Sequence, residues 1–123
     1  MRKKLFNLLI RRAKKLYKDS LRNYKERFYD LALVYLEQAL QLFLKAILLK
    51  KFGDFPKTHK IRELLNLLGF ELSEEDVLIV NLLEDVYIGG RYLEKEYSKE
   101  EYEIALKFVK KIFKKYGFRN SNL

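Results

Sequence analysis

Apolar side chains recur every three or four residues along nearly the whole chain, and this helical period constrains the fold most. Near the C-terminus, for example, Tyr102, Ala105, Val109, Ile112 and Tyr116 alternate at spacings of three and four. No segment shows the alternation of apolar and polar residues that predicts strands. One proline and five glycines also leave few turns for an all-β chain. We therefore predict an all-α fold, an up-and-down bundle of five helices.

Turn and capping residues predict where these helices begin and end. We expect helices over about 2–20, 28–52, 59–68, 73–87 and 98–116, with a short connection at 23–27. Gly53 suits the left-handed position that ends the second helix, and Thr58 suits the cap of the third. Ser73 and Ser98 each begin a capping-box pattern, Ser-Glu-Glu-Asp and Ser-Lys-Glu-Glu.

The composition excludes several kinds of site. The chain has no cysteine, so disulfides, thiolate zinc sites, iron–sulfur clusters and cysteine nucleophiles are excluded. Its one histidine, His59, means that no single subunit offers two imidazoles, and there is no glycine-rich phosphate loop. We expect no metal or other cofactor. At 123 residues we expect one domain over 1–118, followed by a short C-terminal tail, 119–123.

Nothing in the sequence predicts stable insertion into a membrane. Its longest apolar runs are far shorter than the roughly 20 residues of a membrane span. The first sixteen residues are interrupted by Arg11, Arg12 and Lys14, which argues against a signal peptide. We therefore expect a cytoplasmic location. Abundant Lys, Glu, Leu and Ile without Cys is also typical of proteins from thermophiles.

The net charge of +9 is concentrated at the two ends of the chain. Residues 1–27 carry eleven Lys or Arg against two acids, and 104–123 carry six against none. The segment 71–103 is acidic, with eleven acids against three bases. The basic first helix could bind nucleic acid, lie on an anionic membrane, or be a bundle helix whose charged face meets the acidic segment; we favour the last. Four of its residues are candidates for nucleic-acid binding: Arg11, Arg12, Lys14 and Lys15.

The predicted second helix carries a line of polar residues in an otherwise apolar sequence. Glu37, Gln41 and Lys45 are four residues apart and therefore share one face. Such a line can be the solvated side of the helix, a buried structural network or a ligand site. We favour the solvated side and retain all three residues as candidates for ligand binding.

Three pieces of the sequence resemble the HEPN domain family. Residues 37–46, Glu-Gln-Ala-Leu-Gln-Leu-Phe-Leu-Lys-Ala, are similar to the family's second helix. Thr58-His59 resembles the start of its third helix, and Arg91-Tyr92 resembles an Arg-Tyr pair that follows its fourth. The pieces occur in the family's order and spacing, and the similarity covers nearly the whole chain.

The resemblance implies a short helical bundle that commonly forms a homodimer. Many such domains are encoded beside a minimal nucleotidyltransferase, and these pairs act as toxin–antitoxin or related regulatory systems. Active members are metal-independent RNases, with an Arg followed four to six residues later by a His in a cleft at the dimer interface. The resemblance thus implies a nucleotidyltransferase partner and nucleotide or RNA binding, and it adds Arg91 and Tyr92 to the candidate ligand-binding residues.

The chain departs from the RNase motif because no histidine follows Arg91. Cleavage without metal needs a group that takes the proton of a 2′-hydroxyl, and His suits that role near neutral pH. Tyr97, with an ordinary pKa of about 10, would replace it poorly. Gln41 is a second departure, since the family often has an acid there. We predict an interaction module; the alternative is an RNase toxin with a degenerate site of Arg91, Tyr97 and His59.

Both His59 and Arg91 also have a structural interpretation. The His59 ring could satisfy a backbone carbonyl or fill space between helices, instead of contacting a ligand. Arg91 could form a salt bridge or cap a carbonyl, instead of contacting a phosphate. We favour the structural interpretation for both.

A homodimer is further predicted from apolar residues outside the expected core stripes. One small bundle should not cover all of them, and exposed apolar patches commonly mark interfaces, most often with two-fold symmetry. They lie on the predicted fourth and fifth helices: Val77, Ile79, Val80, Leu82, Leu83, Leu106, Phe108 and Phe113.

Overall fold

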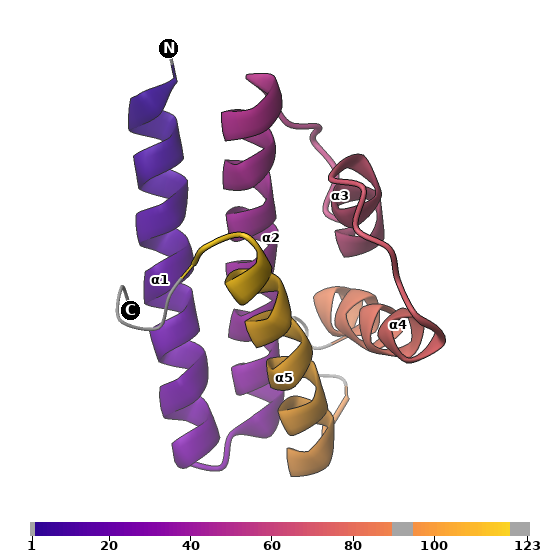
Figure 1. The fold of residues 1–123 in the computed structure, drawn as a ribbon. Helices are drawn as coiled ribbons and strands as arrows, with labels where there is room; N and C mark the ends of the chain where they lie inside the picture. The colour runs from indigo at the N-terminus through magenta and orange to yellow at the C-terminus, as the bar shows by residue number, and fades with distance from the viewer. Residues whose placement is uncertain (1, 90–94, 119–123) are drawn as a thin grey trace.

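The protein folds as five helices, and the described part of the chain contains no strand (Figure 1). The structure is a computed structural model that describes residues 2–89 and 95–118. The helices are α1 (Lys3–Lys25), α2 (Tyr29–Phe52), α3 (Ile61–Leu67), α4 (Glu74–Ile88) and α5 (Lys99–Lys115). The prediction of an all-α fold with five helices is confirmed.

The two long helices α1 and α2 form an antiparallel pair (Figure 1). The first helix continues to Lys25, although its end was expected near Ser20. It continues because Leu21 and Tyr24 pack against the core, where the Tyr24 ring stacks on Tyr102 of α5 with ring centroids 4.9 Å apart. The connection to α2 is therefore shorter than predicted.

The second helix, α2, is the centre of the fold. It contacts each of the other four helices, so side chains around most of its circumference are buried. Among the described residues it is also the one helix long and apolar enough to cross a membrane, yet 72% of that apolar window is buried inside the fold. The core helix of a folded domain is also long, apolar and mostly buried. Gly53 ends α2 in the left-handed conformation, with φ of 80°, as predicted.

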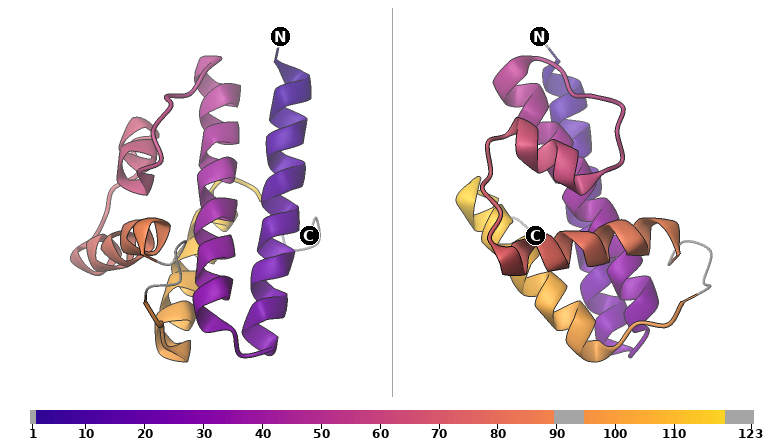
Figure 2. Two further views of the ribbon diagram at one scale, coloured as in Figure 1. Left: turned by 180° about the vertical axis from the view of Figure 1, so that it is seen from behind. Right: turned by 90° about the vertical axis from the view of Figure 1, so that its right-hand side faces the viewer.

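The last two helices begin at the predicted capping boxes. Ser73 and Ser98 each accept a hydrogen bond from the backbone N–H three residues later, and the side chain there accepts one in return. Helix α5 lies along α2, whereas α4 crosses the long helices instead of running parallel to them (Figure 2). This crossing brings α4 into contact with α2, α3 and α5.

The third helix begins at Ile61, two residues later than predicted. Thr58 does not cap it, because its hydroxyl accepts a hydrogen bond from the N–H of Lys60 at 3.1 Å within the preceding loop. Lys60 takes the N-cap position without a side-chain bond. The prediction of a Thr58 cap is wrong.

Half of the apolar residues that suggested a dimer belong to the core of the single chain. The expectation that one bundle could not cover them is wrong for this half, because α4 packs against three helices and α5 packs against α2 and α4. Four of the residues are at most 3% exposed: Val80, Leu83, Phe108 and Phe113. The other four are partly buried: Val77, Ile79, Leu82 and Leu106.

Candidate functional site

The polar line on α2 is buried. Glu37, Gln41 and Lys45 are 1%, 6% and 9% exposed. The interpretation as a solvated side is wrong, because helices pack on more than one side of α2 and cover the face that carries these three residues. We call these three residues the α2 polar column.

Hydrogen bonds link Glu37 to Gln41 within the α2 polar column and Gln41 to His59 in the loop before α3. The Gln41 side-chain amide donates through Nε2 to the Glu37 carboxylate. Its Oε1 lies 3.4 Å from Nδ1 of His59, a long contact in which the Nδ1–H tautomer would donate. Among the described residues no buried side-chain nitrogen or oxygen lacks a hydrogen-bond partner. Within the column, Glu37 and Gln41 therefore form a satisfied polar pair, as a buried carboxylate requires.

His59 connects this network to α4. Its ring stacks on Tyr87, with centroids 5.1 Å apart and planes 17° apart. The residue itself is exposed, so the ring lies over the outer end of the network. The structure thus brings together two predicted site residues, Gln41 and His59, and adds Tyr87, which sequence analysis missed. Tyr87 carried no signal, since a tyrosine late in an apolar helix resembles any core residue.

Lys45 is the cationic end of the α2 polar column. Burial lowers the pKa of Lys45, and the attraction of Glu37 opposes this effect without cancelling it. The ammonium nitrogen also lies 5.9 Å from the centre of the Phe55 ring, in the loop after α2. Charges of both signs are therefore held on one buried helix face, and either could orient a polar ligand or a neighbouring chain.

Tyr97 belongs to a different cluster. Its hydroxyl donates to Asp85 of α4 at 2.9 Å, and Lys95 binds both oxygens of the same carboxylate at 2.9 Å. Burial, followed by the hydrogen bond to Asp85, raises the pKa of Tyr97 far above its ordinary value. Asp85 and Tyr87 are two residues apart on α4 and do not face each other, so Tyr97 and His59 contact different sides of the helix. Tyr97 is therefore poorly suited to act as a base. The other two candidates, Arg91 and Tyr92, lie outside the described residues.

The comparisons with known proteins add one finding. The family model of the HEPN domain matches residues 6–118. The chain belongs to the HEPN domain family. The searches of curated proteins and of solved structures found no match. The predicted membership of the HEPN domain family is thus confirmed.

The basic face of this HEPN domain lies on α1. Arg11, Arg12 and Lys15 are exposed, and Lys14 is half-buried with its Nζ 5.9 Å from the Phe118 ring. The interpretation of α1 as a bundle helix with a charged outer face agrees with this exposure. Within the described residues, however, no ion pair joins α1 to the acidic segment. Acidic residues of α4 instead form ion pairs with Arg62, Lys95 and Lys111. These cations are nearer, since α4 contacts α2, α3 and α5 more closely than α1.

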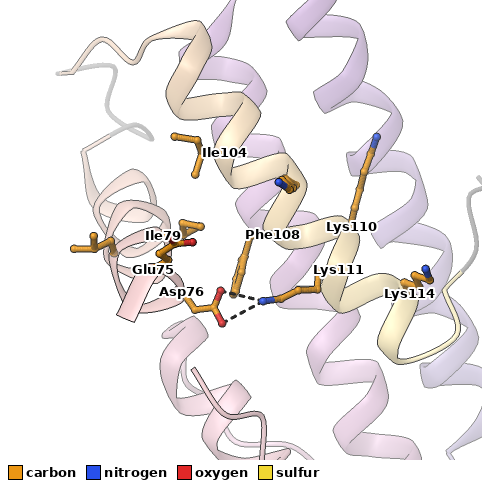
Figure 3. Close-up of a pocket in the computed structure, with 10 residues that line it drawn as sticks. Glu75, Asp76, Ile79, Ile104, Phe108, Lys110, Lys111 and Lys114 are labelled. Atoms are coloured by element: carbon orange, nitrogen blue, oxygen red, sulfur yellow. Dashed lines mark hydrogen bonds and ion pairs between the residues drawn. The ribbon is translucent and has the colours of Figure 1, made fainter. Parts of the chain in front are cut away.

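The HEPN domain also has a groove between α4 and α5 that sequence analysis missed (Figure 3). Its volume is about 870 Å³, and Lys111 reaches across it to Asp76 at 3.0 Å. Burial acts to raise the pKa of Asp76, but hydrogen bonds from Ser73 and Lys111 outweigh it and hold that pKa below its ordinary value. The signal in the sequence was the spacing of Ile104, Lys107 and Lys111 along α5.

Proposed function

We propose that this HEPN domain is a homodimeric interaction module. It works with a minimal nucleotidyltransferase partner, in a toxin–antitoxin or related regulatory pair in the cytoplasm, and takes nucleotide or RNA as a ligand. The observation that carries the proposal is the position of the one imidazole of the chain, that of His59. His59 stacks on Tyr87 and contacts the α2 polar column, and no histidine follows Arg91 in the sequence.

The chemistry supports binding over catalysis. RNA cleavage without metal requires a base with a pKa near the working pH, beside a cation that stabilises the phosphate. Arg91 would supply the cation. Tyr97 does not supply the base, because burial and Asp85 raise its pKa. An interaction module needs neither group, only a stable fold with exposed surfaces.

Affinity capture of the tagged protein from its native host tests the proposal. Mass spectrometry of the eluate should identify a nucleotidyltransferase, and treatment with RNase before elution should leave it bound. An eluate without any nucleotidyltransferase would contradict the proposal.

One observation favours a second candidate, a metal-independent RNase. His59 is exposed, so its ring is accessible to a second subunit. A homodimer could bring His59 of one subunit toward Arg91 of the other. In that case RNA cleavage would need both residues.

A further inference from the structure

The groove between α4 and α5 has exposed apolar side chains on both walls. Leu78 of α4 is 69% exposed, and Ile104 of α5 is 53% exposed. Both line the groove, together with the partly buried Ile79. A single exposed leucine is ordinary, but several aliphatic side chains that share one concave surface are typical of an interaction site. Neither Leu78 nor Ile104 helps to fill the core.

The groove also has an excess of positive charge. Glu75 and Asp76 are the acids of its lining, and Asp76 is already neutralised by Lys111, whose Nζ donates to both oxygens at 3.0 and 3.2 Å. Three other lysines line the groove and form no ion pair within the described part of the chain: Lys107, Lys110 and Lys114. An occupant that carries carboxylates would therefore meet unneutralised cations beside an apolar surface.

The arrangement of these residues matches a helix better than an irregular segment. Along α5, Ile104, Lys107, Lys111 and Lys114 follow at spacings of three, four and three. They therefore form one straight stripe on the helix surface. An amphipathic helix that lies along such a stripe contacts it with residues that recur every three or four positions.

The same lysines could attract RNA, but the apolar lining favours a protein helix. Bases bind to protein grooves largely by stacking on exposed aromatic rings. The aromatic ring of this groove, Phe108, is only 3% exposed, and Nζ of Lys111 lies 5.6 Å from its centre. The accessible apolar side chains are aliphatic, and these gain most by burial against leucine or isoleucine.

We propose that the α4–α5 groove is the docking site for an acidic, amphipathic helix of a protein partner. Leu78 and Ile104 contact its apolar face, and Lys107 and Lys114 face its carboxylates. The inference rests on the proposed function, because the groove would be the surface to which the protein partner binds. The α2 polar column takes no part in this binding.

A synthetic peptide tests the groove without the native partner. The probe is a helix of about five turns, held helical by a side-chain lactam, with leucine every three or four positions and glutamate on the flanks. Fluorescence anisotropy with the full chain should show saturable binding. Raising the ionic strength from low salt to about 0.15 M should weaken it, because salt screens exposed charges.

Surface variants then locate the peptide. Ile104→Asp should weaken binding about tenfold or more, and Lys107→Glu about threefold. Leu67→Asp is the matched control, because Leu67 lies on α3 and is also 53% exposed. It should bind like the wild type, as should Lys18→Glu on α1. Leu78→Asp replaces Ile104→Asp if the latter fails to show a cooperative melt by circular dichroism.

Three outcomes would overturn the inference. A scrambled peptide of the same composition that binds equally well would indicate attraction of charge alone. Single-stranded RNA could instead bind and displace the peptide. If Lys107→Glu weakened this RNA binding and Ile104→Asp did not, the groove would be assigned to nucleic acid. A fall in the mass measured by light scattering for Ile104→Asp would assign it to a second copy of the chain. Because no nucleotidyltransferase enters this experiment, its failure is distinguishable from failure of the proposed function.

Discussion

Replacing Gln41 by leucine should destabilise the protein by about 1–2 kcal/mol. Gln41 is 6% exposed, and its Nε2 donates to the buried Glu37 carboxylate. A hydrogen bond to a charged group contributes about 1.5–3 kcal/mol. The leucine side chain has a similar volume, and burial of its apolar surface offsets up to about 1 kcal/mol of this loss. The contact with His59 is long, at 3.4 Å, and adds little.

Urea unfolding at a fixed protein concentration, followed by circular dichroism, measures this change. With a slope of about 2 kcal/mol per molar urea, the midpoint should fall by roughly 0.5–1 M. Gln38→Leu is the matched control, because Gln38 lies on the same helix, is half-buried and forms no hydrogen bond within the described residues. Its stability should stay within about 0.5 kcal/mol of the wild type.

A Gln41→Leu midpoint equal to or above that of the wild type would refute the reasoning. It would mean that the α2 polar column does not stabilise the fold. Polar groups that cost stability are typical of sites kept for function, so this result would favour the ligand-site interpretation of the column.

Three further predictions concern charge, surface and assembly. The lowered pKa of Asp76 contributes stability that is present above the unfolded-state pKa of about 3.9 and is lost as pH falls through the lower folded-state value. In urea unfolding, the free energy of unfolding of the wild type should exceed that of Asp76→Asn by less below about pH 4 than above it. A difference that stays constant with pH would exclude this contribution of Asp76. If RNA binds α1, four glutamine substitutions should weaken binding and flatten its salt dependence in filter-binding titrations, whereas an unchanged salt slope would exclude this face. The substituted residues are Arg11, Arg12, Lys14 and Lys15. Light scattering at micromolar protein should give twice 14.9 kDa, and a mass of 14.9 kDa would refute the homodimer.

The helices could be predicted from the sequence where a local signal sets their ends. Ser73 and Ser98 begin α4 and α5 because a capping box needs only residues three apart in the chain. The end of α1 was missed because Tyr24 keeps it helical by stacking on Tyr102, which lies far along the chain. The start of α3 was missed because the Thr58 hydroxyl has a competing partner in the loop.

The candidate site was less predictable than the fold. The spacing of Glu37, Gln41 and Lys45 places them on one face, but the period alone does not reveal whether that face is in water. Burial depends on the crossing of α4 and on the loop that carries His59, and neither is encoded in α2 itself. For the same reason Phe108 was expected at a dimer surface and lies in the core.

The proposed function, binding without RNA cleavage, can be tested directly. The most direct measurement is incubation of the purified protein with single-stranded RNA in the presence of EDTA. The RNA should stay intact, and any residual cleavage rate should equal that of Arg91→Ala. The reason is that loss of a positioned general base typically lowers the rate about 10²–10⁴-fold. Rapid cleavage that disappears in both Arg91→Ala and His59→Ala would contradict the claim and would assign the base to His59.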